Sequence, residues 1–517
     1  MDTTRNPGHE ENPVKGKKSQ KLASDPAGRA SAHSAGASDI QFLDVYLGDI
    51  LVGRLSRAGD VIQFLGEPEY LDNPMRPTLS LSMNSLDPAQ GDTITRRVFT
   101  EPGTQWTRAV GRLPAFFENL LPEGALRTLL ARERGVGTDQ QFDLLAATGH
   151  SLPGAVSARP SREEQLGAQS ASMQAHAAGL RARSGRPNSD PAAYLPHFAS
   201  IDAPMETGFS LAGQQMKLAM SMDPDSRRYT LKARDARGVE IIAKLPSVER
   251  MDVVEIEFAG MRLAQAAGVQ TPKFWMEDAS RLDVSNAAAL CPGGRFLAIE
   301  RFDRPQGRPA VHMEDWAQLT GRRPAEKYAK EEAFVMGLRA LRQYSPDRFA
   351  DAQEFIRRQV ANVLMGNTDA HLKNFSFIYP DGRLPRLSPA YDMVPIIAYL
   401  GDGRYALNEK VEAMFQQMTA EDFTRVAQAA GFAPKAVAKE VKRAVEQIQD
   451  AWPALLADLP IEESLREKIR VRLDFLPLAR GVSPANAVRG AGKGPEPISP
   501  NAVAQPSTTK KPRKAAL

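Results

Sequence analysis

Hydrophobic and polar residues follow different periodicities in different parts of this chain. From residue 39 to about 160, short runs of β-favouring residues alternate with helical stretches such as 124–131. From 207 to about 310, strand-like runs dominate around one helical stretch at 253–267, whereas from 311 to about 480 apolar residues recur at helical spacing. We therefore predict an α+β protein with a small N-terminal subdomain, a β-rich small lobe and a helical C-terminal lobe.

Three further stretches lack such a pattern. Residues 1–38 and 481–517 are rich in small and polar residues and nearly free of aromatics, so we predict that both tails are disordered. Residues 161–206 have a similar composition and are long for a loop within a compact domain, which indicates a linker or insertion. The C-terminal tail is also basic, because it holds Lys510, Lys511, Arg513 and Lys514.

Length, cysteine count and charge narrow the class of protein. At 517 residues the chain is too long for one ordinary core, so two or three domains are expected. Its one cysteine, Cys291, permits no internal disulfide, which fits a reducing cytoplasm. A single cysteine also argues against a cysteine-based metal site. The net charge of +4 is too small to indicate nucleic-acid binding by itself. No apolar run approaches 18 residues, so we expect neither a membrane span nor a secretory signal, and a cytoplasmic location.

Three side chains carry the clearest chemical signal. Asp369 precedes Asn374 by five residues, and Asp392 follows downstream, which is the layout of a kinase catalytic loop and its metal-binding acid. In that chemistry one carboxylate accepts the proton of the attacking hydroxyl, while an amide oxygen and a second carboxylate hold Mg²⁺. A glycine-containing break at 366–368 predicts that Asp369 lies on a tight turn. Taken singly, Asn367 and Asp369 also fit an ordinary helix cap and turn, and His371 fits an ordinary turn histidine.

A lysine within an apolar strand-like run is a second candidate. Lys244 is flanked by apolar residues at 241–246, where a buried ammonium group requires a partner. In kinases, a strand lysine of this kind contacts the α- and β-phosphates and pairs with a glutamate on a helix. Glu257 is the candidate partner and Glu255 the competing one. The alternative is an edge-strand lysine that points to solvent.

Two further segments fit a nucleotide site. The segment 210–217 permits close backbone approach at Ala212 and Gly213, although it lacks the standard glycine-rich patterns and fits a simple strand turn equally well. The segment 300–303 closes the small-lobe strands, where an inter-lobe connection offers backbone groups to adenine; it also fits an amphipathic strand end. Downstream, Glu314 and Asp315 fit the cap of the next helix.

In combination and in this order, these segments resemble the HipA-type serine/threonine kinase toxins of bacterial type II toxin–antitoxin modules. The resemblance covers about residues 40–480. It is carried by the segments 120–124 (Leu-Leu-Pro-Glu-Gly), 153–156, 210–217, 242–246, 300–304, 367–376 and 390–392.

The resemblance implies a two-lobed protein-kinase-like fold and a protein kinase that uses ATP and Mg²⁺. It assigns Asp369 as the catalytic base and gives Mg²⁺ to Asn374 and Asp392. It assigns ATP contacts to Ala212, Gly213, Gln214, Gln215, Met216, Lys217, Lys244, Glu300, Arg301, Phe302, His371, Asn374, Tyr391 and Asp392.

The resemblance also implies regulation and partners. Ser210 matches the family's autophosphorylated serine, and a phosphate there adds a charge of about −1.5 to −2, which would repel the nucleotide. The implied partners are a protein substrate such as an aminoacyl-tRNA synthetase, a helix-turn-helix antitoxin and, mainly through the antitoxin, operator DNA.

The chain departs from the family pattern at several positions. Ile256 stands where the family often has asparagine, Met313 stands where it often has glutamine, and the 161–206 stretch is unusual. These departures leave substrate choice open. Two alternatives remain at this point: a small-molecule phosphotransferase, and a catalytically silent co-repressor that binds an antitoxin.

Overall fold

A computed structural model describes most of the patterned part of the chain. The described residues are 40–101, 104–161, 216–231, 237–246, 251–284, 287–328, 332–400 and 406–481. The N-terminal tail, nearly all of the 161–206 stretch and of the C-terminal tail, Ser210 and residues 212–215 lie outside them, so the predictions made there stay predictions.

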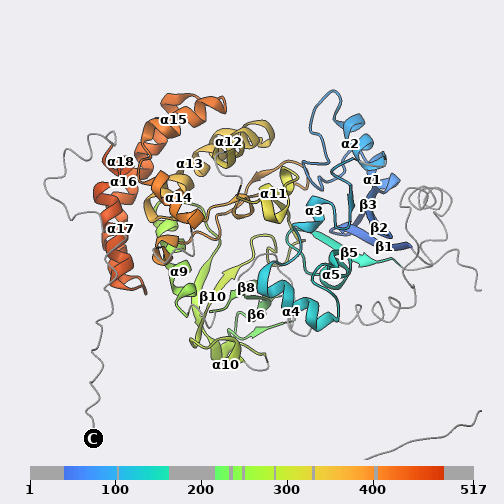
Figure 1. Ribbon diagram of the computed structural model, residues 1–517, viewed down its shortest axis with the longest axis horizontal. Helices are drawn as coiled ribbons and strands as arrows, with labels where there is room; N and C mark the ends of the chain where they lie inside the picture. The colour runs from blue at the N-terminus through green and yellow to red at the C-terminus, as the bar shows by residue number, and fades with distance from the viewer. Residues whose placement is uncertain are drawn as a thin grey trace, which may run out of the picture. The chain divides into compact units, whose positions relative to one another are not determined.

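The N-terminal subdomain is built on an antiparallel sheet of five strands (Figure 1). The order is β4-β3-β2-β1-β5, with β1 (Ile40–Leu47), β2 (Ile50–Ala58), β3 (Val61–Gly66), β4 (Arg108–Val110) and β5 (Val156–Pro160). Its helices are α1 (Pro68–Asp72), α2 (Gly91–Thr100), α3 (Ala115–Glu118), α4 (Gly124–Arg134) and α5 (Gln141–Thr148). Phe64 packs against Phe99 and Phe117 in its buried core.

The small lobe holds a second sheet of five strands, in the order β7-β6-β8-β10-β9. These are β6 (Lys217–Met222), β7 (Tyr229–Thr230), β8 (Val239–Lys244), β9 (Phe274–Asp278) and β10 (Arg295–Glu300), accompanied by α9 (Val253–Ala266), η2 (Ala279–Arg281) and α10 (Ala287–Leu290). Lys217 and Lys244 are direct partners across β6 and β8, so both side chains leave the same face of the sheet.

The C-terminal lobe is mainly helical, as predicted, with α11 (Trp316–Leu319), α12 (Glu332–Tyr344), α13 (Arg348–Met365), α14 (Ala406–Phe415), α15 (Ala420–Ala429), α16 (Pro434–Asp458), α17 (Glu463–Phe475) and α18 (Pro477–Arg480). Three short 3₁₀ turns join them: η3 (Pro324–Glu326), η4 (Leu372–Asn374) and η5 (Ile396–Tyr399). A small sheet was not predicted: β11 (His312–Asp315), β12 (Ser376–Tyr379) and β13 (Arg386–Leu387). Strands of two to four residues are too short to show an alternating pattern.

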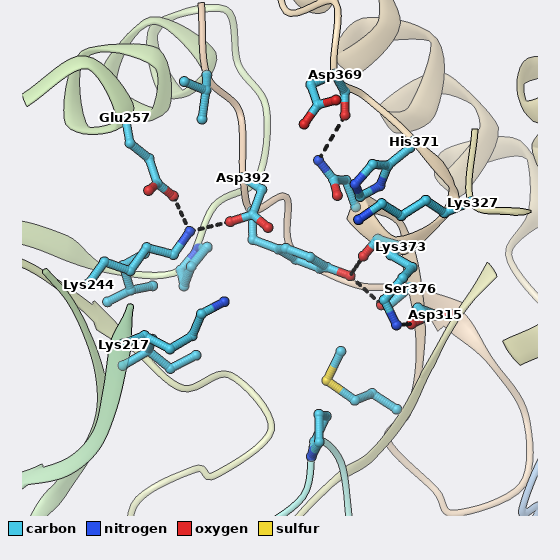
Figure 2. A pocket seen from close by; sticks show the side chains of 18 of the residues that line it. Lys217, Lys244, Glu257, Asp315, Lys327, Asp369, His371, Lys373, Ser376 and Asp392 are labelled. Atoms are coloured by element: carbon cyan, nitrogen blue, oxygen red, sulfur yellow. Dashed lines mark hydrogen bonds and ion pairs between the residues drawn. The ribbon is translucent and has the colours of Figure 1, made fainter. Parts of the chain in front are cut away.

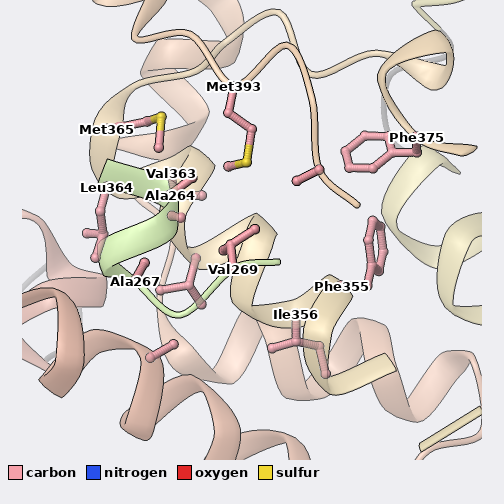
Figure 3. Close-up of a cluster of buried hydrophobic side chains, with 14 of the residues drawn as sticks. Ala264, Ala267, Val269, Phe355, Ile356, Val363, Leu364, Met365, Phe375 and Met393 are labelled. Carbon is pink, nitrogen blue, oxygen red and sulfur yellow. The ribbon is translucent and has the colours of Figure 1, made fainter. Parts of the chain in front are cut away.

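Helix α9 of the small lobe packs into the core of the helical lobe. Figure 3 shows side chains of the α9 end, such as Ala264, beside Val363 and Met365 of α13 and beside Met393. The indole Nε1 of Trp452 on α16 donates a hydrogen bond to the Leu263 carbonyl oxygen at 2.9 Å. This packing fixes α9, and therefore Glu257, relative to the helical lobe.

Among the described residues, no helix combines the length and the apolar character needed to cross a bilayer.

Candidate active site

A cavity of about 330 Å³ collects side chains from the N-terminal subdomain and from both lobes. Its wall includes most of the described residues that the sequence predicted for a nucleotide site: Lys217, Lys244, Glu300, Arg301, Phe302, Asp369, His371, Asn374, Tyr391 and Asp392. Met216 is described but does not line it; the Met216 carbonyl oxygen accepts a hydrogen bond from the Leu245 amide at 3.0 Å.

Asp369 lies on a turn that begins where α13 ends. Gly366 caps α13 with a left-handed φ of 73°, and a Cβ atom there would meet the Ile397 side chain at 2.3 Å. Asp369 lies on this turn, as predicted, and η4 begins three residues later. Asn374 Nδ2 donates a hydrogen bond to the Asp369 carbonyl oxygen at 3.3 Å. Because Nδ2 is used in this way, Asn374 Oδ1 is the atom left for a ligand or metal.

Lys244 is held between two carboxylates. Its ammonium group forms ion pairs with Glu257 on α9 and with Asp392, and Figure 2 shows both contacts. The partner on α9 is therefore Glu257, as predicted, whereas the competing Glu255 is not in this pair. The side chains of Lys244 and Glu257 are almost fully buried, so their opposite charges stabilise each other in a region that water does not solvate.

Charge and burial shift the pKa values around this trio. Burial would raise the pKa of the Asp392 carboxyl, but Lys244 and Lys217 lower it well below its usual range. Burial would lower the pKa of Lys244, but Asp392 and Glu257 raise it. Burial, followed by repulsion from Lys244, lowers the pKa of Lys217 to about 8. At neutral pH two ammonium groups therefore face the Asp392 carboxylate, whereas burial outweighs the effect of Lys244 and raises the pKa of Glu257.

The backbone around Asp392 depends on a glycine in α9. A Cβ atom on Gly260 would lie 2.0 Å from the Met393 carbonyl oxygen, so no other residue permits this approach without displacement. Gly260 lies one helical turn after Glu257, and Met393 directly follows Asp392. The close approach therefore brings the Glu257 face of α9 to the Asp392 segment.

The predicted adenine segment divides into two kinds of residue. The Arg301 guanidinium is buried and forms hydrogen bonds of 3.0 and 2.7 Å with Asp303, whose Oδ2 also accepts from the Gly154 amide at 2.9 Å. Although Arg301 lines the cavity, its guanidinium group also donates a hydrogen bond to the Leu152 carbonyl oxygen at 3.4 Å, which joins the lobe to the N-terminal subdomain. Phe302 is stacked on Tyr391 with ring centroids 6.1 Å apart, and both rings line the cavity.

The cap prediction for Glu314 and Asp315 was half correct. Asp315 caps α11, and its Oδ1 accepts from the Gln318 amide at 2.8 Å. Glu314 does not cap a helix: it lies fully buried in β11 and accepts hydrogen bonds from Ser80 Oγ at 2.5 Å, the Leu81 amide at 2.9 Å and the Tyr379 hydroxyl. Because β11 was not predicted, neither was this site.

The cavity also contains residues for which the sequence gave no role. Glu123 precedes α4 in the N-terminal subdomain, and Lys327 and Tyr328 follow η3. Glu123 lies in the quoted segment 120–124, so the resemblance pointed to the segment without pointing to its chemistry. Lys327 and Tyr328 carried no sequence signal, because a lone lysine beside a tyrosine is common.

The residues present fit a magnesium nucleotide. Among the described residues no group of three or more His, Cys, Asp or Glu side chains forms a metal site by itself. Mg²⁺ in phosphoryl-transfer sites is typically held by one or two carboxylates together with substrate phosphates, which is what Asn374, Asp392 and the cavity offer. The buried Nδ1 of His371 has no hydrogen-bond partner among the described residues, as expected where a polar ligand belongs.

Comparison with known proteins agrees with the fold and with the order of the domains. The HipA N-terminal domain family matches residues 43–159, and the HipA-like C-terminal domain family matches residues 209–452. The chain is 35% identical over 419 residues to a protein of Sinorhizobium fredii named putative kinase Y4dM, covering 80% of this chain and 91% of that protein.

More distant relatives point the same way. The serine/threonine-protein kinase toxin HipA of Shewanella oneidensis is 25% identical over 387 residues, with 69% of this chain and 76% of that protein covered. In a solved complex of Shewanella oneidensis HipA with HipB and operator DNA, the matching chain has a TM-score of 0.53 and 20% identity, with 86% of this chain and 99% of that chain covered. Since the two HipA domains follow one another here as well, and since the extensive match to the Sinorhizobium protein spans both, this chain belongs to the HipA family.

Proposed function

We propose that this protein is an ATP-dependent serine/threonine protein kinase that acts as the toxin of a toxin–antitoxin module. The observation that carries the proposal is the convergence of Asp369, Asn374, Asp392 and the Lys244–Glu257 pair on one cavity. Family membership supports it, because relatives are named putative kinases and a serine/threonine-protein kinase toxin.

Each side chain has a role that its position supports. Asp369 accepts the proton of the acceptor hydroxyl as the hydroxyl oxygen attacks the γ-phosphorus. The bond from that phosphorus to the β–γ bridging oxygen breaks, and ADP leaves with the electron pair. Lys244 and Lys217 bind phosphate oxygens, and Phe302 with Tyr391 forms an aromatic wall for the base. Asn374 Oδ1 and Asp392 would hold Mg²⁺, which offsets the charge of the phosphates.

The proposed partners and regulation follow from the family. A helix-turn-helix antitoxin and operator DNA are proposed because the Shewanella oneidensis structure is a complex of HipA, HipB and operator DNA. The proposed substrate is a translation-related protein such as an aminoacyl-tRNA synthetase, and the proposed compartment is the cytoplasm. Self-inactivation by phosphorylation of Ser210 stays a proposal, since Ser210 lies outside the described residues.

Transfer from radiolabelled ATP tests the proposal. The wild type, incubated with Mg²⁺ and a panel of purified aminoacyl-tRNA synthetases, is expected to label a protein on serine or threonine, and Asp369→Asn is expected to lose this label while still binding ATP. A parallel panel of sugars and antibiotics tests the small-molecule alternative. Equal labelling by wild type and Asp369→Asn, or labelling of small molecules alone, contradicts the proposal.

A further inference from the structure

Lys327 and Tyr328 make backbone and side-chain contacts with the loop that contains Asp369. The Leu372 amide donates a hydrogen bond to the Lys327 carbonyl oxygen at 3.1 Å. The Tyr328 ring packs edge-on against the His371 ring, with centroids 5.1 Å apart, and Tyr328 is hydrogen-bonded to the Asp369 carboxylate. Three contacts thus hold this dipeptide in register with the proposed catalytic base.

The Lys327 ammonium group is placed by the N-terminal subdomain. Its Nζ donates a hydrogen bond to Glu123 Oε2 at 2.8 Å, and the side chains of Lys327 and Glu123 are about 8% and 12% exposed. Burial would raise the pKa of Glu123, but Lys373 and Lys327 lower it, so Glu123 is an anion at neutral pH.

Lys373, which also lines the cavity, differs from Lys327 in the number of hydrogen bonds that its ammonium group donates. Its Nζ donates to Asn119 O at 2.9 Å, Asn119 Oδ1 at 3.0 Å and Asp315 Oδ2 at 3.0 Å, which accounts for all three donors of an ammonium group. Among the described residues Lys327 donates to Glu123 alone, so two of its N–H bonds remain for a ligand in the cavity.

The charge of Lys327 reaches the reaction side of the cavity. Burial and, after it, repulsion from Lys327 lower the pKa of His371 to about 4, so His371 is neutral at pH 7. Its ring lies close to this ammonium group (Figure 2). In Figure 2, Lys327 lies beside His371 and below Asp369, whereas Lys217 and Lys244 enter from the opposite side of Asp392. Cations therefore face the cavity from two sides.

We propose that Lys327 is the cation that stabilises the phosphoryl group during its transfer, and that Glu123 is the positioning residue that orients the Lys327 ammonium group. The inference rests on the proposed kinase function. During transfer, negative charge spreads over the equatorial oxygens of the moving phosphoryl group, and a fixed cation beside the catalytic base lowers the barrier. Lys217 and Lys244 grip the phosphates in the ground state, whereas Lys327 acts from the acceptor side.

A purely structural ion pair is the competing explanation. A buried Lys–Glu pair that only joins two parts of a protein contributes little net stability and is replaceable by neutral residues of similar shape. Its removal would change thermal stability and would lower affinity for every nucleotide state to the same degree. A cation that acts during transfer affects turnover and transition-state mimics selectively.

The test compares Lys327→Met, Lys327→Arg, Glu123→Gln and the double variant Lys327→Met/Glu123→Gln with the wild type. Lys442→Met, which removes an exposed lysine from α16, is the matched control. Turnover is followed as phosphate transfer from ATP, to the protein itself and to a general kinase substrate. Equilibrium affinity is measured for Mg·ATP and for Mg·ADP with aluminium fluoride, which mimics the phosphoryl group during transfer.

We expect Lys327→Met to lose about 10²–10³-fold in kcat. Its affinity for Mg·ATP should fall less than threefold, while affinity for the aluminium fluoride complex falls by at least tenfold. Glu123→Gln should lose about tenfold in kcat in the wild type and nothing more in the Lys327→Met background, because it acts through Lys327. Lys327→Arg should restore part of the rate, since the charge is kept.

The outcomes separate this inference from the function on which it rests. If the wild type transfers no phosphate to any acceptor, the proposed function fails. Suppose instead that the wild type transfers phosphate, but that folded Lys327→Met keeps its rate or loses affinity for Mg·ATP and for the aluminium fluoride complex equally. The proposed kinase function is then supported, and the role proposed for Lys327 is wrong. The double variant keeps the buried pair neutral, so a folded protein is available even if the single variants are unstable.

Discussion

Lys244 on β8 forms an ion pair with Asp392, a residue 148 positions later in the chain. The same ammonium group binds Glu257, so one lysine joins the sheet of the small lobe, its helix and the segment that follows β13. The proposed phosphate ligand and the proposed metal ligand therefore neutralise each other before a nucleotide arrives. Under the proposed function, binding of Mg·ATP would exchange this pair for phosphate–lysine and metal–carboxylate contacts, so that the buried charges stay compensated.

Lys244→Met is expected to lower both nucleotide affinity and stability. Removing the ammonium group leaves the buried Glu257 carboxylate without its partner, which costs about 3–5 kcal/mol in comparable buried pairs. Thermal denaturation measures the stability, and titration with a fluorescent ATP analogue measures the affinity.

A second substitution separates these two effects. Lys244→Met/Glu257→Gln removes both charges, so most of the lost stability should return. Affinity for ATP should not return, because no cation reaches the phosphates from β8. If the double variant binds ATP as well as the wild type, Lys244 is only a structural residue.

Asp392→Asn is expected to leave the stability of the protein unchanged, whereas Asp392→Ala is expected to lower it, because of the backbone conformation at this position. Its φ of +53° lies in the left-handed region, where asparagine is well tolerated and alanine costs about 1–2 kcal/mol. Asp392→Asn should therefore keep the fold and lose Mg²⁺-dependent transfer, while Asp392→Ala should also lower the melting temperature. Similar melting temperatures for the two variants, measured by differential scanning fluorimetry, would contradict this account of the backbone.

The parts of this site that are local in sequence were predictable. The turn at Asp369 follows from the glycine that ends α13, and the Lys244–Glu257 pair follows from an isolated charge in an apolar run next to an amphipathic helix. Both signals are local, since even Lys244 and Glu257 are only 13 positions apart. Asp392 was found through its position in a known order of motifs.

The contribution of the N-terminal subdomain was not predictable in the same way. Glu123 meets Lys327 across 204 positions, and Ser80 meets Glu314 across 234. A single residue such as Glu123 or Ser80 shows no periodicity. Which residue it contacts depends on how the N-terminal subdomain packs against the rest of the protein. The β11-β12-β13 sheet was missed for a related reason, because β11 pairs with a strand far away in the sequence, as in the Asp315–Ser376 pair, and is not specified by local propensity.

Glu314 should make the stability of the protein fall as pH rises from about 4.5 to about 7. Burial raises the pKa of Glu314 from about 4.5 to about 7, despite hydrogen bonds from Ser80, Tyr379 and Leu81 that lower it. Between these two values the folded state holds a proton that the unfolded state has released, so stability from this group is full below pH 4.5 and is lost by about pH 7. The expected loss is about 3 kcal/mol.

Glu314→Gln is the matching variant, because it stays neutral at every pH. The difference in unfolding free energy between wild type and Glu314→Gln, measured by urea denaturation from pH 5 to pH 8, should move in favour of the variant as pH rises. The other titrating groups cancel in this difference. Parallel stability profiles for the two proteins would show that Glu314 does not titrate in this range.

Lys217 should make nucleotide binding weaken in mildly alkaline solution. Burial and repulsion from its cross-strand partner Lys244 lower the pKa of Lys217 to about 8, so below pH 8 it is a cation that attracts phosphate and above pH 8 it is increasingly neutral. Affinity for Mg·ATP should therefore be steady near pH 7 and fall by up to about tenfold per pH unit above 8.

Bound phosphate raises the pKa of the Lys217 ammonium group, so binding near pH 8.5 should be accompanied by proton uptake. Calorimetric titration in two buffers of different ionisation enthalpy measures that proton directly. Lys217→Arg is the control, because a guanidinium group stays protonated throughout and should abolish both the alkaline fall and the proton uptake. If the wild type takes up no more protons than Lys217→Arg does, the phosphates do not reach Lys217, and the nucleotide must be placed further toward Asp369 than proposed.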